Sequence, residues 1–353
     1  MKLGIIGLPQ TGKTTLFNAL TGNDQPTNAS AGRMEVHTAV VDVPDPRIDQ
    51  LSAMYKPKKT IYAKVTYADI AGLDGSGQGS ISGALLNQIG QMDALIHVVR
   101  CFEDGNVAHA TGSVDPARDI AAMNGELLLN DLIIVERKLE RLTEERKRGG
   151  TDKVINARQT ELFERLHAIL SEEKPLREIE FTDIEDSDLS GFGLLTRKRM
   201  LILLNLGEGQ TAPTIETEYS IPVVDLMGKL EMEISQLPPD DAAMFMEEYG
   251  IQEPGLNKMI RLSYDLLQLQ SFFTVGEDEV RAWTVRRGAT AQESAGVIHS
   301  DLEKGFIRAE VVTYEDLTTL GGMSEARNKG KLRLEGKQYI VQDGEIMHIR
   351  FNI

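Results

Sequence analysis

The amino-acid sequence predicts an α/β fold in three parts: an α/β domain, a helical hairpin inserted into it, and a small β-grasp domain at the end. Three observations support this prediction. Short apolar runs alternate with helix-like stretches over residues 1–120. Apolar residues then repeat at helical spacing up to about residue 175, and short strands bounded by turn residues follow from about residue 270. We therefore expect domains at residues 1–120 with 196–268, at 121–195 and at 269–353.

The first apolar run, residues 3–6, leads into a glycine-rich loop. Residues 7–14 fit the pattern G-x-x-x-x-G-K-[ST], and a helical pattern follows, as in a phosphate-binding loop. The glycines let backbone N–H groups surround phosphate oxygens, while Lys13 supplies a positive charge to the outer phosphates. The alternative is a glycine-rich turn that binds nothing. We predict a nucleoside triphosphate site on a P-loop NTPase domain, with contacts from Leu8, Pro9, Gln10, Thr11, Gly12, Lys13, Thr14 and Thr15.

A second motif follows the apolar run at residues 62–68. Asp69, with Gly72 three residues later, fits D-x-x-G, in which the carboxylate holds Mg²⁺ through water and the Gly amide senses the terminal phosphate. The pattern alone is common by chance, but its place at the end of a strand after a phosphate loop supports the assignment. We expect Thr14 and Asp69 to be the metal residues and Gly72 to contact the nucleotide.

The middle of the chain predicts a helical hairpin with a coiled-coil seam. Apolar residues recur at intervals of three and four along residues 128–142, and the same rhythm returns after the glycine pair at 149–150. Basic residues crowd the tip, at Arg146, Lys147 and Arg148. Two interpretations stay open: a solvated face, or an arm that binds a partner.

The last part predicts a β-grasp unit. A hairpin over residues 272–285, a helix at 291–298 and a strand at 306–312 come first. A strand pair at 331–334 and 338–341 and a last strand at 346–351 follow. Trp283, Phe272 and Phe273 are expected in its core rather than on a stacking platform.

Composition excludes several classes of protein. A net charge of −16 argues against sequence-independent nucleic-acid binding over the whole surface. The one cysteine, Cys101, offers neither an intramolecular disulfide nor a zinc cluster, which fits a reducing compartment. The chain has no apolar stretch long enough to span a membrane, and Met1 leads directly into the first strand without a signal peptide. We expect a cytoplasmic protein.

Together these motifs resemble the Obg-like ATPases of the YchF type, within the translation-factor-related P-loop GTPases. The resemblance covers nearly the whole chain: the phosphate loop, residues 69–73, residues 97–104, Asn205-x-x-Glu208, the arm and a closing β-grasp unit of the TGS type. It implies ATP hydrolysis with Mg²⁺, a preference for adenine over guanine, and association with the ribosome. The basic tip of the arm is then a candidate contact for ribosomal RNA.

The position that recognises the base supports the adenine preference. GTPases carry N-K-x-D after the corresponding strand, whereas Leu206 replaces the Lys and Glu208 replaces the Asp that accepts the two guanine donors. We expect contacts from Asn205, Leu206 and Glu208, and Asn205 could pair with adenine or only tie this loop to the phosphate loop. Gly228 stands in a stretch that replaces the family's S-A-K-x-E, and its amide could face the base.

The residue after D-x-x-G determines how the attacking water is held. Ras-type GTPases place a Gln there, but Leu73 can neither accept nor donate a hydrogen bond. His109, in the glycine-flanked loop of residues 105–112, matches a His that the family carries there, and an imidazole can accept a proton near neutral pH. The alternative is an exposed loop His without a role. The family's switch Thr falls on Arg33, for which Thr38 could substitute as a Mg²⁺ ligand.

We therefore expect a Mg²⁺-dependent ATPase that acts as a molecular switch on the translation apparatus, with His109 and Lys13 in catalysis. Two alternatives remain: a GTPase of the same class, and a nucleotide-gated binding module whose hydrolysis has decayed. The sequence leaves the oligomeric state open.

Overall fold

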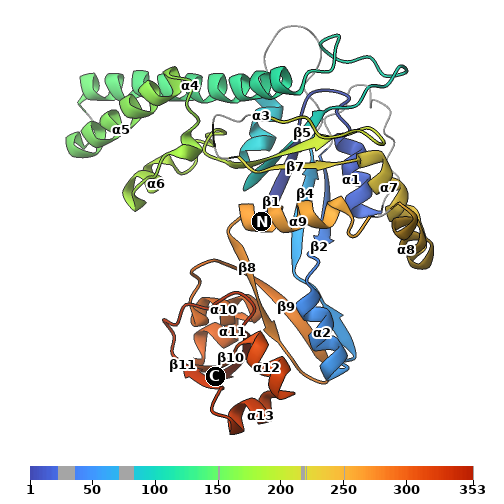
Figure 1. Cartoon of the computed structure of the whole chain (residues 1–353). Helices are drawn as coiled ribbons and strands as arrows, with labels where there is room; N and C mark the ends of the chain where they lie inside the picture. The colour runs from blue at the N-terminus through green and yellow to red at the C-terminus, as the bar shows by residue number, and fades with distance from the viewer. Residues whose placement is uncertain are drawn as a thin grey trace. The chain divides into compact units, whose positions relative to one another are not determined.

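The computed structural model describes residues 1–22, 36–70, 83–149, 152–215, 219, 221–249 and 251–352. The chain divides into two compact units. Met1–Ala39 and Tyr67–Leu256 form the first, and Val40–Thr66 and Asn257–Ile353 form the second. Figure 1 shows a mixed α/β architecture with two β-sheets, as the sequence predicts.

The nucleotide-binding motifs lie on a sheet whose described strands have the order β2-β4-β1-β5-β6-β7. Strand β1 pairs in parallel with β5, β5 with β6, and β6 with β7. Parallel strands bring their carboxyl ends to one edge of a sheet, where the ligands of such folds bind. The strands are β1 (Lys2–Ile6), β2 (His37–Asp42), β4 (Lys64–Asp69), β5 (Ala94–Arg100), β6 (Arg199–Asn205) and β7 (Val223–Leu226).

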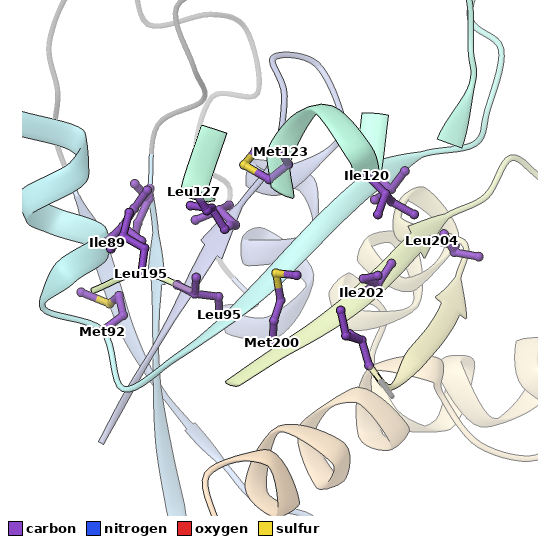
Figure 2. Packing of buried hydrophobic residues seen from close by; sticks show 14 of the residues in the cluster. Ile89, Met92, Leu95, Ile120, Met123, Leu127, Leu195, Met200, Ile202 and Leu204 are labelled. Carbon is purple, nitrogen blue, oxygen red and sulfur yellow. The ribbon is translucent and has the colours of Figure 1, made fainter. Parts of the chain in front are cut away.

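The core of the first unit forms between this sheet and its helices. Strand β5 is buried along its whole length, as expected for a central parallel strand covered on both faces. Figure 2 shows Ile120 and Met123, near the start of the long helix α4 (Pro116–Arg148), packed over the sheet with Leu95 and Met200. The other helices of the first unit that follow its strands are α1 (Lys13–Thr21), α3 (Gly83–Gly90), α7 (Gly228–Gln236) and α8 (Pro239–Glu248). Helix α9 (Gly255–Leu266) belongs to the second unit from Asn257 on.

The predicted helical hairpin is present. Helix α4 packs against α5 (Lys153–Ser171) through an apolar seam that includes Val135 and Leu166. A 3₁₀ turn, η1 (Leu176–Glu178), and a short helix, α6 (Asp183–Leu189), lead back to the sheet. The return is fixed by Asp131 of α4, whose buried carboxylate accepts hydrogen bonds from the backbone N–H groups of residues 195 and 196 at 2.8 and 2.7 Å.

The second unit has its own sheet, with the described strands in the order β11-β10-β12-β8-β9-β3. The predicted hairpin is confirmed as the antiparallel pair of β8 and β9, and Phe272 lies in the core of the unit. The strands are β3 (Lys59–Ile61), β8 (Leu269–Thr274), β9 (Glu279–Arg286), β10 (Phe306–Val312), β11 (Arg333–Glu335) and β12 (Ile346–Phe351). Its helices are α2 (Pro46–Tyr55), α10 (Ala291–Ile298), α11 (Ser300–Lys304), α12 (Tyr314–Leu320) and α13 (Met323–Asn328).

One predicted strand of this unit is wrong. Residues 338–341 do not form a strand, and only a single bridge joins Ile340 to Thr290 in the described chain. Strand β11 pairs with β10 instead. The buried carboxylate of Glu345 accepts hydrogen bonds from the Tyr339 hydroxyl at 2.7 Å and from the Gln342 backbone at 2.9 Å, which holds this stretch as a loop.

Residues 40–66 join the second unit, although the sequence places them between two nucleotide-binding motifs. Their strand β3 pairs in parallel with β9, with Lys59 opposite Glu279. The predicted domain boundaries stay predictions, but this segment shows that the sheet of the second unit draws on two distant parts of the chain. No helix in the described part of the chain is long and apolar enough to cross a membrane.

Candidate nucleotide-binding site

The loop between β1 and α1, the predicted phosphate loop, has three residues with positive φ angles. Gly7 and Gly12 have φ angles of 154° and 92°, which favour glycine. A Cβ atom on Gly12 would lie 2.2 Å from Nδ2 of Asn205, so a larger residue does not fit there. Gln10 also has a positive φ, 62°, which costs a residue with a side chain conformational energy. The loop is thus held in one shape by its neighbours.

Lys13 is the first residue of α1, and its side chain reaches back into this loop. Its Nζ donates hydrogen bonds to the carbonyl oxygens of Gly7 and Leu8, at 3.1 and 2.7 Å. Burial lowers the pKa of Lys13 to about 8, and the nearby charge of Asp69 opposes that shift. A phosphate ligand would stabilise the charged form of this buried ammonium group, because it brings negative oxygens close to it.

The two predicted metal residues are brought together, although 55 positions separate them in the sequence. The Thr14 hydroxyl donates a hydrogen bond to Oδ2 of Asp69 at 3.0 Å. Oδ1 of Asp69 is buried and has no hydrogen-bond partner among the described residues. Burial raises the pKa of Asp69, whereas the Thr14 hydrogen bond and the Lys13 charge lower it. The Thr14 hydroxyl and the Asp69 carboxylate, one oxygen of which is orphaned, fit Mg²⁺, which prefers hard oxygen ligands.

Asn205 connects the phosphate loop to the start of α7. Its Nδ2 donates to the carbonyl oxygen of Thr11 at 2.9 Å, and its Oδ1 accepts from the Gly228 N–H at 3.0 Å. The tie between loops, one of the two interpretations of Asn205, is therefore present. Pairing with adenine stays a prediction. The Gly228 amide, expected to face the base, donates to Asn205 in this structure.

The other predicted base contacts differ in exposure. Leu206 is 5% exposed and belongs to the apolar core, together with Ile120 and Ile221, whereas Glu208 is exposed. Thr38, the candidate substitute in the first switch, is exposed on β2. Gly72, Leu73 and Arg33 lie outside the described residues, so the expectations for them stay predictions.

His109 lies in the loop between β5 and α4. Its side chain is 5% exposed, so it is not an exposed loop His, and its role in catalysis stays a prediction. Nε2 of His109 lies 3.1 Å from Oδ2 of Asp119, in the first turns of α4, and the Thr111 N–H donates to Nδ1 at 3.2 Å. The loop turns back at Gly112, where φ is 87°.

Two residues at this loop have contacts that the sequence did not predict. Arg100, at the end of β5, is 1% exposed and donates to the carbonyl oxygens of Phe102 and Val107 at 3.0 and 2.9 Å. A charged residue at the end of a strand that is mostly apolar is a signal that could have singled it out. Asp119 carried no comparable signal, because an acidic residue in the first turns of a helix is common for reasons of the helix dipole alone.

Known protein families match both ends of the chain. A family model described as "50S ribosome-binding GTPase" matches residues 2–138. A second model, for the C-terminal part of YchF GTPases and described as "Protein of unknown function (DUF933)", matches residues 269–352. The residues between these two matches are covered by relatives that align over the full length of the chain.

The chain is 42% identical to the ribosome-binding ATPase YchF of Bacillus subtilis, over 99% of this chain and 99% of that protein. It is 40% identical to the ribosome-binding ATPase YchF of Escherichia coli O157:H7, over 100% of this chain and 99% of that protein. Among solved structures, the YchF GTPase of Schizosaccharomyces pombe is similar with a TM-score of 0.86 and 30% identity, over 99% of this chain and 97% of that chain.

Proposed function

This chain belongs to the YchF family, and from that membership we propose that it binds and hydrolyses ATP with Mg²⁺ and that the nucleotide switches its association with the ribosome. The observation that carries the proposal is the meeting of Thr14, Lys13 and Asp69 at one edge of the sheet. The bacterial relatives named above are ribosome-binding ATPases, and these three residues supply the cation and the oxygen ligands that such an activity needs.

The phosphate loop supplies binding and charge. Its backbone N–H groups and the N-terminus of α1 face the phosphates, and Lys13 exchanges its two carbonyl partners for phosphate oxygens. Mg²⁺, held by the Thr14 hydroxyl and through water by Asp69, would neutralise negative charge on the outer phosphates. Oδ1 of Asp69, which has no hydrogen-bond partner among the described residues, would accept a hydrogen bond from a water of the bound ion. Positioning and charge compensation are the main needs of phosphoryl transfer.

The attacking water needs a base, and His109 is the proposed one. An imidazole accepts a proton near neutral pH, and positioned proton transfer contributes roughly 10² to 10⁴ in rate. Both ring nitrogens of His109 are engaged in this structure, with Asp119 and Thr111. Catalysis therefore requires the loop to move so that an unprotonated nitrogen faces the water.

Adenine is the proposed base. Leu206 stands where GTPases have the Lys that covers a guanine ring, and its side chain is buried in the core. Glu208 is longer than the Asp of GTPases and places its carboxylate differently. GTP hydrolysis is the second candidate, because the similar S. pombe protein and both matching family models are named as GTPases. The ribosome is the proposed partner, with ribosomal RNA at the arm tip, and the cytoplasm is the proposed compartment because ribosomes work there.

Phosphate release tests the proposal. The purified chain is assayed with Mg²⁺ and either ATP or GTP, with and without ribosomes. We expect ATP turnover, stimulation by ribosomes, and ATP affinity at least equal to GTP affinity. Lys13→Ala should abolish triphosphate binding, and His109→Ala should lower turnover at least about tenfold at nearly constant affinity. A GTP affinity about a hundredfold tighter would overturn the base assignment, and absence of turnover with either nucleotide would favour the binding module.

A further inference from the structure

The contacts of His109 indicate which nitrogen carries its proton. Nδ1 accepts a hydrogen bond from the backbone N–H of Thr111 at 3.2 Å, and the Thr111 hydroxyl lies 3.0 Å from the same atom. A backbone N–H can only donate, so Nδ1 holds a lone pair and the proton of the neutral ring is on Nε2. Nε2 then lies 3.1 Å from Oδ2 of Asp119, an electrostatic contact without the geometry of a hydrogen bond. The lone pair that a general base needs is thus already occupied.

Asp119 is arranged to keep His109 in this place. Its side chain is 2% exposed, and its Oδ1 accepts from Nε and a terminal nitrogen of Arg118 at 3.0 and 2.9 Å. Oδ2 has no hydrogen-bond partner of good geometry among the described residues, so the imidazole is its main compensation. A buried carboxylate oxygen that loses its compensating group is destabilised. Moving His109 away therefore costs free energy, because it leaves the buried Oδ2 of Asp119 without its compensating group.

The loop that carries His109 has two further attachments. Arg100 donates to the carbonyl oxygens of Phe102 and Val107 at 3.0 and 2.9 Å, and the backbone N–H of Gly112 donates to the carbonyl oxygen of His109 at 3.0 Å. These bonds fix the backbone on both sides of the histidine, whereas the ring is held at Nδ1 by Thr111 and at Nε2 by Asp119. Both ring contacts must break for the imidazole to turn, and the one with Asp119 is made by a side chain that a substitution can remove.

We propose that Asp119 is a positioning residue that holds His109 away from catalysis, and that removal of its carboxylate releases the imidazole. This inference rests on the proposed function, because it takes His109 as the catalytic base. Loss of one compensated buried contact corresponds to roughly a 5- to 100-fold change in population. Asp119→Ala should therefore raise the rate constant of hydrolysis at least about fivefold, with unchanged ATP affinity.

Single-turnover ATP hydrolysis and ATP titration test this with Asp119→Ala, Asp119→Asn, His109→Ala and the Asp119→Ala/His109→Ala double variant. Asp119→Asn keeps the side-chain size and should give a smaller increase in rate. The double variant should be as slow as His109→Ala. Asp115→Ala is the matched control, because it removes the N-cap carboxylate of the same helix, which accepts from the Arg118 backbone N–H, and should stay within about twofold of the unmodified rate.

Three results would overturn the proposal: a rate for Asp119→Ala as low as that of His109→Ala, an unchanged rate, or a faster rate that persists without His109. The first would mean that Asp119 orients the base in its working position. Nitrogen-15 NMR of the imidazoles gives a readout independent of activity. In the unmodified chain the His109 signal, identified by its loss in His109→Ala, should show a proton on Nε2, and in Asp119→Ala it should show both tautomers.

The two failures are distinguishable. If His109→Ala hydrolyses ATP normally, His109 is not the base. If Asp119→Ala still changes the tautomer of His109 in the NMR spectrum, the holding contact is supported all the same. A His109 tautomer that Asp119→Ala leaves unchanged would reject the holding contact, whatever the effect of His109→Ala on hydrolysis.

Discussion

Lys13 is a buried cation whose charge depends on its ligand. Its pKa in the free chain is lowered to about 8 by burial, and a bound triphosphate raises the pKa because negative oxygens replace carbonyl partners. Below about pH 8 the lysine is charged in both states, so affinity is flat. Above it, binding must take up a proton, and affinity falls.

We expect the ATP affinity of the unmodified chain to decrease above about pH 8, by at most about tenfold per pH unit, until the pKa of the bound state is reached. Calorimetric titration between about pH 7.5 and pH 9.5 measures this. Lys13→Ala is the control, with weak binding that has no step in this range. A flat profile in the unmodified chain would show that free Lys13 keeps its proton throughout this range, despite its burial.

Gln10 occupies a backbone conformation that suits a different residue. Its φ of 62° is left-handed, where Asn is enriched and β-branched residues are rare. We expect Gln10→Asn to raise the free energy of unfolding by up to about 1 kcal/mol, and Gln10→Val to lower it by about 1 kcal/mol or more. Thermal unfolding without nucleotide compares the two variants. Equal stability of the Val variant and the unmodified chain would mean that the loop relaxes to another conformation.

At the scale of elements, helix α4 has two different ends. Near its start, Ile120, Met123 and Leu127 belong to the core of the first unit, whereas the residues at its other end, 146–148, are exposed. Asp115 caps the start, and Gly149, with φ 74°, ends the helix. A helix anchored at one end and exposed at the other suits the presentation of its basic tip to a partner.

We expect reversal of charge at the tip, Arg146→Glu with Lys147→Glu, to weaken co-sedimentation with ribosomes. Binding of the unmodified chain should also fall as salt rises, because each neutralised phosphate releases counterions. The matched control reverses Arg137 and Arg141, two exposed residues one turn apart on the same helix. Equal loss in both variants would locate the effect in overall charge, and no loss in either would place the ribosomal contact elsewhere.

At the scale of the whole molecule, the second unit depends on a segment that lies early in the sequence. Arg47 of α2 forms ion pairs with Asp45 at 2.8 Å and with Asp343 at 2.7 Å, and its guanidinium lies 5.2 Å from the centre of the Phe273 ring. Gly344 permits this approach, since a Cβ there would lie 2.5 Å from Arg47. These contacts attach residues 40–66 to a sheet formed from the end of the chain.

We expect Arg47→Ala to lower the free energy of unfolding of the second unit by about 1–3 kcal/mol, because two charged hydrogen-bonded contacts are lost. Urea unfolding of the full chain, followed by the fluorescence of Trp283, reports on that unit, since the chain has one tryptophan. The control is Lys58→Ala, whose ion pair with Asp278 is highly exposed and worth less than about 1 kcal/mol. Identical midpoints for the two variants would contradict the anchoring role of Arg47.

The sequence by itself determined the class of fold and the helical hairpin, and it predicts the residues of the phosphate site. Motif spacing predicted that Thr14 and Asp69 meet, because the carboxyl ends of parallel strands share one edge of the sheet, and they lie 3.0 Å apart. Helical periodicity predicted the arm because the spacing that places apolar residues on one face of a helix is a local property. It can be recognised in the sequence before the partner of that face is known.

Tertiary structure alone decided which distant segments meet. Asn205 lies against Gly12 and Gly228, His109 pairs with Asp119, and β3 joins β9 rather than a strand of its own region. Residues 338–341 have a strand-like composition but form a loop around Glu345. In each case the conformation is stabilised by contacts between residues that are far apart in the sequence or that belong to no periodic pattern. The secondary-structure propensity of a segment limits which elements it can form, and the tertiary contacts available to it decide which of them it adopts.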